Sequence, residues 1–335
     1  MKVSVLLICY NQRRFITDAL EAALTQEDRD YELIIADDAS TDGTQQAIEA
    51  GLARHPGRPV TYFSNARNLG LVANFWKAVS RATGDIIVPM AGDDISLPAR
   101  VGLVRAHFER HPRCMALFAA AEIIDGDGRP TGGRITSWQD GPSARNSLNY
   151  ESCQPGRNLL AGRPFSGAAA GYRREVFGSY PNLIGKPINA EDEICMLRAM
   201  LLGTVDFLPA VHVNWRIHGT NQSFGLGPYR GPAQAGYYQR QANMCDQFIA
   251  DLHNACGPEV IPETEQARLE TAILRIRAEW KLWSACHEPG VRLGAWADAF
   301  VELARTHGSV LGALSRAARP TIKMLTPFWL QRIFA

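Results

Sequence analysis

The first 125 residues alternate between short apolar runs and amphipathic segments, and this alternation restricts the fold more than any other feature. Short apolar, β-branched runs predict strands over residues 3–9, 31–36, 60–64, 85–90 and 114–124, and the first of them is expected to be fully buried. Apolar residues at helical spacing predict helices over residues 15–24, 44–54, 71–82 and 98–110. Alternation of this kind builds a mostly parallel sheet with helices on both faces, so we predict an α/β fold.

Polar residues follow these predicted strands at the points where they end: Tyr10-Asn11, Asp37-Asp38, residues 65–68 and Asp93-Asp94. Parallel strands bring their carboxyl ends to one edge of the sheet, and ligands bind beyond that edge. The polar strand ends therefore predict a single binding site.

The pair Asp93-Asp94 lies in the stretch MAGDDISLP. Adjacent carboxylates repel each other unless a positive group lies near them. Oxygen ligands in a loop suit Mg²⁺ or Mn²⁺, although a DD pair can also begin a turn and cap the next helix. The position of this pair, level with the other polar strand ends, favours a metal.

Asp37-Asp38 begins the stretch DDASTDGT, which is rich in turn and capping residues. The pair can cap the next helix, or it can accept hydrogen bonds from a base or a ribose. Tyr10 can stack on a planar ring or be an ordinary aromatic residue at the rim. The sequence has neither GxGxxG after its first strand nor GxxxxGK[ST], so phosphate charge would have to be met by a metal and by basic residues.

Three stretches resemble the family 2 inverting glycosyltransferases of GT-A fold: VSVLLICYNQRRFITDALEAALTQ, YELIIADDASTDGT and NLGLVANFWKAVSRATGDIIVPMAGDD. The resemblance is strong over about residues 1–125 and continues more weakly, through Glu191-Asp192 and WRIHGTNQS, to about residue 225. It implies a GT-A domain over 1–225, with a nucleotide-sugar half at 1–125 and an acceptor half at 126–225. Residues 226–335 would form a helical C-terminal region, with amphipathic patterns at 233–255, 263–287 and 291–306.

The resemblance also implies roles for residues of the donor site. Those expected to bind the nucleotide, usually a uracil nucleotide, are Tyr10, Asp37, Asp38, Asn65, Arg67 and Asp93. Asp94 matches the DxD position that holds Mg²⁺ or Mn²⁺, with His218 as a second ligand. The first DxD position, commonly acidic, is Ala91 here, so metal binding rests on Asp93 and Asp94.

Asp192 matches the aspartate of the ED motif, which the resemblance makes the general base. Glu191 and Arg216 would contact the diphosphate or form the acceptor loop. In an inverting transfer one carboxylate deprotonates the acceptor hydroxyl while the metal offsets charge on the leaving diphosphate. Two alternatives stay open: Glu191-Asp192 are acids favoured at a helix N-terminus with no catalytic role, and Arg216 and His218 belong to a solvated loop.

The predicted activity is transfer of a hexosyl or N-acetylhexosaminyl group from a nucleotide-diphospho-sugar, such as a UDP-sugar, to a glycan or lipid-linked glycan. Bacterial surface polysaccharide biosynthesis would be the setting. Two rival classes are a nucleotidyltransferase, which would need a glycine-rich loop after the first strand, and a non-catalytic sugar-nucleotide or glycan-binding protein, which would not need Asp192. The donor sugar, acceptor, linkage and oligomeric state are not indicated by the sequence.

The cysteines are seven in number and scattered, without a CxxC pair, which argues against a disulfide framework or a zinc site. The N-terminus reads as a strand rather than a signal peptide, and no apolar run is long enough to span a membrane, so a cytoplasmic location is expected. A net charge of +1 gives no reason to expect nucleic-acid binding.

Residues 303–335 have no acid and mix cations with large apolar residues. This composition predicts either a peripheral contact with the inner face of the membrane or a terminal helix packed on the protein. Phe165-Ser166-Gly167-Ala168 can shape an acceptor wall or serve close packing.

Overall fold

The structure is a computed structural model, which describes residues 1–135, 152–153, 167–180, 183, 185–219, 221, 232–255, 263–287 and 293–307. The chain forms two compact units, residues 1–180 with 190–218 and residues 181–189 with 219–335. The boundary predicted near residue 225 lies outside the described residues.

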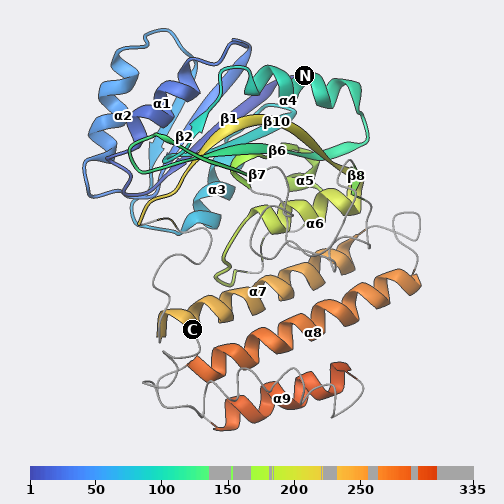
Figure 1. The fold of residues 1–335 in the computed structure, drawn as a ribbon. Helices are drawn as coiled ribbons and strands as arrows, with labels where there is room; N and C mark the ends of the chain where they lie inside the picture. The colour runs from blue at the N-terminus through green and yellow to red at the C-terminus, as the bar shows by residue number, and fades with distance from the viewer. Residues whose placement is uncertain are drawn as a thin grey trace. The chain divides into compact units, whose positions relative to one another are not determined.

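The first unit is built on a sheet whose first four strands are parallel (Figure 1): β1 (Val3–Cys9), β2 (Tyr31–Asp37), β3 (Val60–Ser64) and β4 (Ile86–Ala91). β6 (Cys114–Ile124) and β10 (Thr204–Arg216) pair in parallel with each other. β9 (Gly171–Arg173) runs antiparallel between β4 and β6, which leaves β6 and β10 in the same direction as β1 to β4. The prediction of a mostly parallel sheet is confirmed.

Short antiparallel strands complete the sheet within the described residues. β5 (Ile95–Ser96) and β8 (Ser152–Cys153) pair with β10, and β7 (Pro130–Ile135) pairs with β6. The strand order is β3-β2-β1-β4-β9-β6-β10-β5. All carboxyl ends of β1 to β4 therefore meet at one edge of the sheet, as predicted, and the first residues of β6 and β10 lie at the opposite edge.

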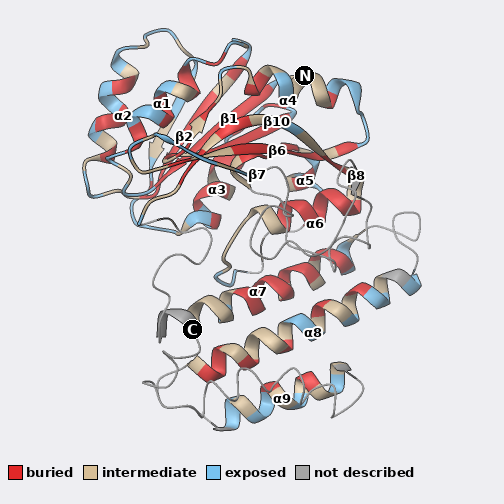
Figure 2. Cartoon of the chain, in the orientation of Figure 1, coloured by how far each residue is buried: buried red, intermediate tan, exposed pale blue. Residues whose placement is uncertain are grey.

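Helices cover both faces of this sheet, and the alternation of side chains along β1 shows which helix covers which face. Val5 and Leu7 pack with α1 (Ile16–Leu24), α2 (Thr44–Ala53) and α4 (Arg100–Arg110). Leu6 and Ile8 pack with α3 (Leu71–Val79), α5 (Glu175–Gly178) and α6 (Asp192–Leu202). Because both faces of β1 are covered, every residue of this strand is buried (Figure 2).

Most predicted element ends lie within a few residues of the observed ones, and the differences have local causes. The helix predicted over 71–82 ends at Val79, since the N–H groups of residues 81 and 82 form tighter i→i−3 bonds. Pro98 precedes α4 rather than lying in its first turn, because residues 97–100 form a separate turn. β10 ends at Arg216, which still pairs with Ile124 of β6.

The second unit contains the helices α7 (Pro232–Asn254), α8 (Glu263–His287) and α9 (Leu293–His307), close to the predicted patterns. α8 packs against both of the others (Figure 1). Leu282 and Leu303 belong to the apolar cluster between α8 and α9. Arg277 of α8 pairs with Asp246 of α7 and with Glu302 of α9, each at 2.7 Å.

Among the described residues, none of the helices is both long enough and apolar enough to cross a lipid bilayer. Residues 308–335, which carry most of the predicted membrane-contacting tail, lie outside the described residues.

Candidate active site

Asp37, the last residue of β2, is fully buried and surrounded by donors from the protein itself. Its Oδ2 accepts hydrogen bonds from Ser64 Oγ at 2.7 Å, Gln45 Nε2 at 3.0 Å and the Ser40 N–H at 3.1 Å. This carboxylate therefore ties the ends of β2 and β3 to α2 and to the turn before it.

Asp38 performs a similar task for the next loop. Its Oδ1 accepts from Asn65 Nδ2 and from the Leu69 N–H, both at 2.8 Å, and its Oδ2 accepts from the Gly70 N–H at 2.7 Å. The residue is only 2% exposed. Asp38 thus holds the loop after β3 against the end of β2.

Asn65 belongs to the same buried network. Besides donating to Asp38, its Nδ2 donates to Asn74 Oδ1 at 2.9 Å, and its Oδ1 accepts from Lys77 Nζ at 2.7 Å. Arg67, two residues further along this loop, is exposed.

Tyr10 is the exposed residue that follows β1, with 37% of its surface accessible. The chain turns sharply just after it, because Asn11 has a positive φ of 50° and its Oδ1 accepts from the Thr41 N–H at 2.8 Å. Asparagine adopts this backbone region more readily than most residues. Tyr10 and Arg67 are therefore the accessible members of the predicted nucleotide set, whereas Asp37, Asp38 and Asn65 are buried.

Asp93 and Asp94 follow β4 after a tight turn at Gly92, where a Cβ would lie 2.4 Å from Gln12 Oε1. Asp94 is buried, and its Oδ1 accepts from the Arg216 N–H at 2.8 Å. Burial, reinforced by the negative charge of Asp93, raises the pKa of Asp94 well above its usual range. The two carboxylates are crowded, as expected from the sequence.

Arg216 and His218 lie against this acidic pair. The Arg216 Nε donates to the Asp93 carbonyl oxygen at 2.8 Å, and Nη2 contacts Asp18 Oδ2 at 3.1 Å. His218 Nε2 lies 3.0 Å from Asp93 Oδ2. The side chains of Arg216 and His218 are 2% and 8% exposed, so the alternative of a solvated loop is wrong for both. The parallel pairing of β10 with β6 carries Arg216 into the interior.

Phe15, at the start of α1, supports both of these side chains. Its ring centroid lies 4.4 Å from that of His218 and 5.0 Å from the guanidinium carbon of Arg216. The structure places His218 beside Asp93, whereas the sequence pairs it with Asp94 as a metal ligand. Phe15 and Asp18 were not recognised as site residues, since both fit the periodicity of an ordinary amphipathic helix.

Glu191 and Asp192 lie at the N-terminus of α6, where a second acidic pair is crowded. Asp192 Oδ2 accepts from the Gly167 N–H at 3.1 Å and Oδ1 accepts from the Glu193 N–H at 2.9 Å. Burial raises the pKa of Asp192 to about 6, against the effect of these hydrogen bonds. Burial and the charge of Asp192 raise the pKa of Glu191 to about 8, and its Oε2 has no hydrogen-bond partner among the described residues.

Gly167 begins the short 3₁₀ helix η2 (Gly167–Ala169) and contacts Asp192 closely. A Cβ on Gly167 would lie 2.8 Å from both Cβ and Oδ2 of Asp192. Close packing thus explains this glycine, which the sequence left open. Phe165 and Ser166 of the predicted acceptor wall lie outside the described residues.

Arg100 was missed in the sequence and bonds to backbone segments near both acidic pairs. It is 1% exposed, and its Nη2 donates to the carbonyl oxygens of Pro89 in β4 and Ala170 after η2, both at 2.9 Å. It therefore anchors the segment that holds Asp192 to the strand that leads to Asp94. The available signal was an arginine at a buried position of the predicted helix after Pro98.

The donor atoms near β4 suit a hard divalent cation. Asp93 and Asp94 offer carboxylate oxygens, His218 offers an imidazole, and the crowding of negative charge is what a cation would relieve. Asp192 offers a second carboxylate with a raised pKa, and it contacts the η2 segment that Arg100 bonds to β4. Raised carboxyl pKa values next to a candidate cation site are typical of functional sites.

Residues 4–180 match the model of the family described as Glycosyl transferase family 2. The EpsE protein of Bacillus subtilis (strain 168) is 38% identical over 124 residues, which cover 37% of this chain and 44% of EpsE. The chain thus spans less than half the length of EpsE. The uncharacterized glycosyltransferase alr2836 of Nostoc sp. (strain PCC 7120 / SAG 25.82 / UTEX 2576) is 27% identical over 253 residues, 75% of this chain and 76% of that protein.

The fold resembles that of S. aureus TarS (residues 1–349), with a TM-score of 0.60, 14% identity and coverage of 96% of this chain and 89% of that chain. TarS in complex with UDP-GlcNAc gives a TM-score of 0.55 at 15% identity, with coverage of 92% and 93%. This likeness confirms the predicted GT-A type α/β fold with C-terminal helices.

Proposed function

Since this chain belongs to glycosyl transferase family 2, we propose that it is an inverting glycosyltransferase. It transfers a hexosyl or N-acetylhexosaminyl group from a nucleotide-diphospho-sugar to a hydroxyl group of a glycan or lipid-linked glycan. A UDP-sugar is the donor to test first, because TarS, which has the same fold, was solved with UDP-GlcNAc.

The observation that carries this proposal is the environment of Asp192. With a pKa raised to about 6, its carboxyl group is largely ionised at neutral pH and is a stronger base than an ordinary aspartate. Asp192 takes the proton of the acceptor hydroxyl while that oxygen forms a bond to the anomeric carbon. The bond from this carbon to the diphosphate oxygen breaks, and the electron pair leaves with the nucleoside diphosphate.

The donor binds at the carboxyl ends of β1 to β4. Tyr10 and Arg67 are exposed there and can contact the base and the nucleotide directly. Asp38 and Asn65 shape the loop beside them through their mutual hydrogen bond, and Asp37 anchors the strand ends.

Asp93 and Asp94, with His218 beside them, would hold Mg²⁺ or Mn²⁺. When bound, the cation offsets the negative charge that develops on the departing diphosphate. Arg216 supports this site by donating its backbone N–H to Asp94 and its Nε to the Asp93 carbonyl. Its guanidinium is thereby committed to positioning the acidic pair, and Glu191 keeps the charge near Asp192 low by holding its proton.

A cytoplasmic location, with a peripheral contact through the basic and apolar tail, suits a lipid-linked acceptor of surface polysaccharide biosynthesis. Within the described residues, cysteines 9, 114, 195, 245 and 286 are free thiols, which supports a reducing compartment.

The test begins with thermal unfolding in Mn²⁺ and a panel of UDP-, GDP- and dTDP-sugars, because a bound donor raises the melting temperature. The stabilising donor is then used to compare wild type, Asp192→Asn and the matched control Glu193→Gln. We expect Asp192→Asn to lower kcat by about 10²–10⁴-fold while nucleotide binding persists, and Glu193→Gln to stay near wild type.

Each other outcome has a definite meaning. Full turnover in Asp192→Asn would remove Asp192 as the base. Binding without hydrolysis or transfer in wild type would favour a non-catalytic binding protein, and no binding by any nucleotide sugar would overturn the proposal.

A further inference from the structure

A second cluster of metal-binding side chains lies at the opposite edge of the sheet from the acidic pairs. It combines His107 from the last turn of α4, Cys114 from the start of β6 and Asp206 from the start of β10. β6 and β10 pair in parallel here, with a register shift just after Thr204. Cys114 and Asp206 lie near the starts of β6 and β10. The cluster is therefore at the amino ends of these strands, whereas the donor site is at the carboxyl ends of β1 to β4.

The ligand atoms of this cluster are already close to one another. His107 Nε2 lies 2.9 Å from Asp206 Oδ2, and these atoms and Cys114 Sγ all lie within 4.8 Å of one another. Ligand atoms around a tetrahedral Zn²⁺ are about 3.3–3.8 Å apart, given zinc bonds of about 2.0–2.3 Å. Shifts of about 1 Å would therefore bring the three atoms into range of one ion.

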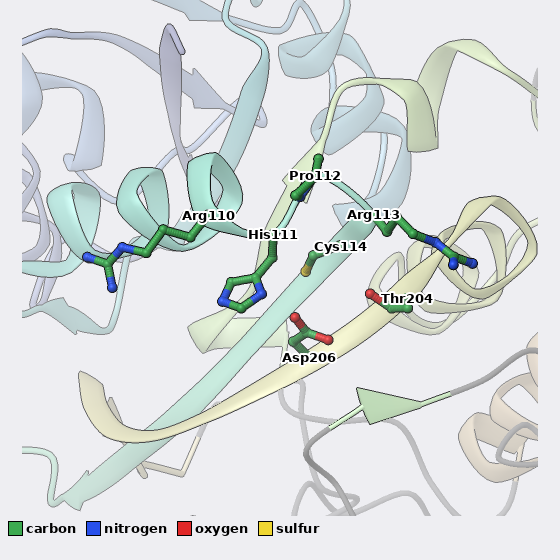
Figure 3. A pocket seen from close by; sticks show the side chains of 7 residues that line it. All are labelled: Arg110, His111, Pro112, Arg113, Cys114, Thr204 and Asp206. Atoms are coloured by element: carbon green, nitrogen blue, oxygen red, sulfur yellow. The ribbon is translucent and has the colours of Figure 1, made fainter.

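The surroundings leave room for an ion. A cavity of about 410 Å³ is lined by Cys114, Asp206 and His111 among others. In Figure 3 the Cys114 and Asp206 side chains face this cavity, while the side chains of Arg110 and Arg113 extend away from it. The His111 ring stacks on His107, with 4.3 Å between the centroids. A second imidazole is thus within reach of the cluster.

The donor atoms determine which metal suits the cluster. One nitrogen, one thiolate sulfur and one carboxylate oxygen are a typical ligand set for Zn²⁺, whereas Mg²⁺ and Mn²⁺ favour oxygen. Burial and the charge of Asp206 raise the pKa of the Cys114 thiol, so the metal-free cysteine holds its proton. A bound divalent cation displaces that proton and forms a thiolate bond.

We propose that His107, Cys114 and Asp206 form a Zn²⁺ site that is separate from the Mg²⁺ or Mn²⁺ site of the donor. The fourth position faces the cavity and is filled by water or by His111. The ion would join α4, β6 and β10, elements that are far apart in the sequence. The absence of closely spaced cysteines does not bear on this cluster, because it uses a single cysteine and ligands from three segments.

The test uses the untagged full-length chain, treated with a chelator and titrated with Co²⁺, a spectroscopic substitute for Zn²⁺. We expect a sulfur-to-cobalt charge-transfer band that saturates at one equivalent and disappears when Zn²⁺ is added. Co²⁺ bound by Asp93 and Asp94 would give no such band, because those ligands are oxygens. The band therefore reports the thiolate site alone, and Asp94→Asn should leave it unchanged.

Three variants decide the assignment. Cys114→Ser removes the band, whereas the matched control Cys286→Ser, which alters a buried cysteine of α8, retains it. Asp206→Asn keeps an oxygen that accepts from His107, so it preserves the fold, and it lowers Zn²⁺ affinity at least about tenfold. Circular dichroism and thermal unfolding confirm that each variant is folded.

A titration of wild type without a charge-transfer band would overturn the proposal. A band that persists in Cys114→Ser, or that is lost equally in Cys286→Ser, would do the same. If Cys114→Ser does not fold, Asp206→Asn decides, and an unchanged Zn²⁺ affinity in that variant contradicts the site.

Discussion

Two adjacent aspartates lie at the carboxyl end of a parallel strand at two places in this sheet, and the hydrogen bonding of the two pairs differs. Oxygens of Asp37 and Asp38 accept hydrogen bonds from donors supplied by nearby loops and strands. Asp94 has its Oδ1 bonded to the Arg216 N–H, and its pKa is raised by burial and by Asp93. One pair is satisfied by the protein, whereas the other is crowded.

The role of an acidic pair at a strand end is therefore set by the hydrogen-bond donors around it rather than by its own sequence. A carboxylate that accepts several N–H bonds is a structural anchor. A crowded carboxylate gains most from an external cation or proton. Substitutions in each pair test this distinction.

Asp94→Asn should lower transferase activity by about 10²-fold or more, because a ligand of the charge-neutralising cation is lost. The same change should leave the melting temperature equal or higher, since the asparagine oxygen still accepts from Arg216 and a buried charge is removed. Activity assays and thermal unfolding of the same preparation check this. A clear loss of stability would show that Asp94 is an anchor like Asp38.

Asp38→Asn should behave in the opposite way and destabilise the fold by about 1–3 kcal/mol. Asp38 now accepts hydrogen bonds from the N–H groups of Leu69 and Gly70. The NH₂ group of asparagine would face one of these N–H groups and leave it without an acceptor. Urea unfolding measures the change. Unaltered stability with reduced nucleotide binding would instead make Asp38 a direct ligand of the base.

Glu191→Gln should stabilise the protein more at pH 8 than at pH 5. Glu191 keeps its proton in the folded state up to about pH 8, whereas the unfolded chain loses it above its ordinary pKa. The effect of Glu191 on the free energy of unfolding is therefore least unfavourable at low pH. This free energy falls as the pH rises, by at most about 1.4 kcal/mol per pH unit. Urea unfolding at both pH values, with Glu193→Gln as the control, checks this. An equal effect at both pH values would contradict the raised pKa.

Tyr10→Ala should have the smallest effect. Loss of one exposed stacking surface should weaken nucleotide-sugar binding by about tenfold, near the lower end of the range for base stacking on aromatic residues. Stability should not change, because Tyr10 is accessible rather than packed. Calorimetric titration with UDP and thermal unfolding separate the two. Unchanged affinity would show that Tyr10 is an ordinary aromatic residue at the rim.

The fold could be predicted because each strand carries its own local pattern. Residues 3–9, 60–64 and 114–124 are strands with the predicted bounds, since these runs are rich in apolar, β-branched and aromatic residues and are followed by polar or turn residues. The convergence of polar strand ends followed from parallel pairing alone. The short strand β9 was not predicted, because its pairing depends on β4 and β6, which are distant in the sequence.

The bonding of the site could not be predicted, since its partners come from remote segments. Asp38 accepts a hydrogen bond from the N–H of Leu69, which is 31 residues away in the sequence. Asp94 accepts one from the N–H of Arg216, which is 122 residues away. The hydrogen bonds of Gly167 with Asp192 and of Arg100 with Ala170 also join residues that are distant in the sequence. The sequence shows which side chains reach the edge of the sheet, and only tertiary structure shows which of them are already bonded.

The hydrogen bond from the Arg216 backbone N–H to Asp94 Oδ1 gives the molecule an internal probe for nuclear magnetic resonance. Amide chemical shifts depend on the charge of the acceptor, so a cation or proton on Asp94 would move the Arg216 cross-peak. The Gly70 amide, which faces Asp38, serves as an internal reference. A titration with diamagnetic Mg²⁺ would therefore measure occupancy of the acidic pair without a donor sugar, an acceptor or turnover.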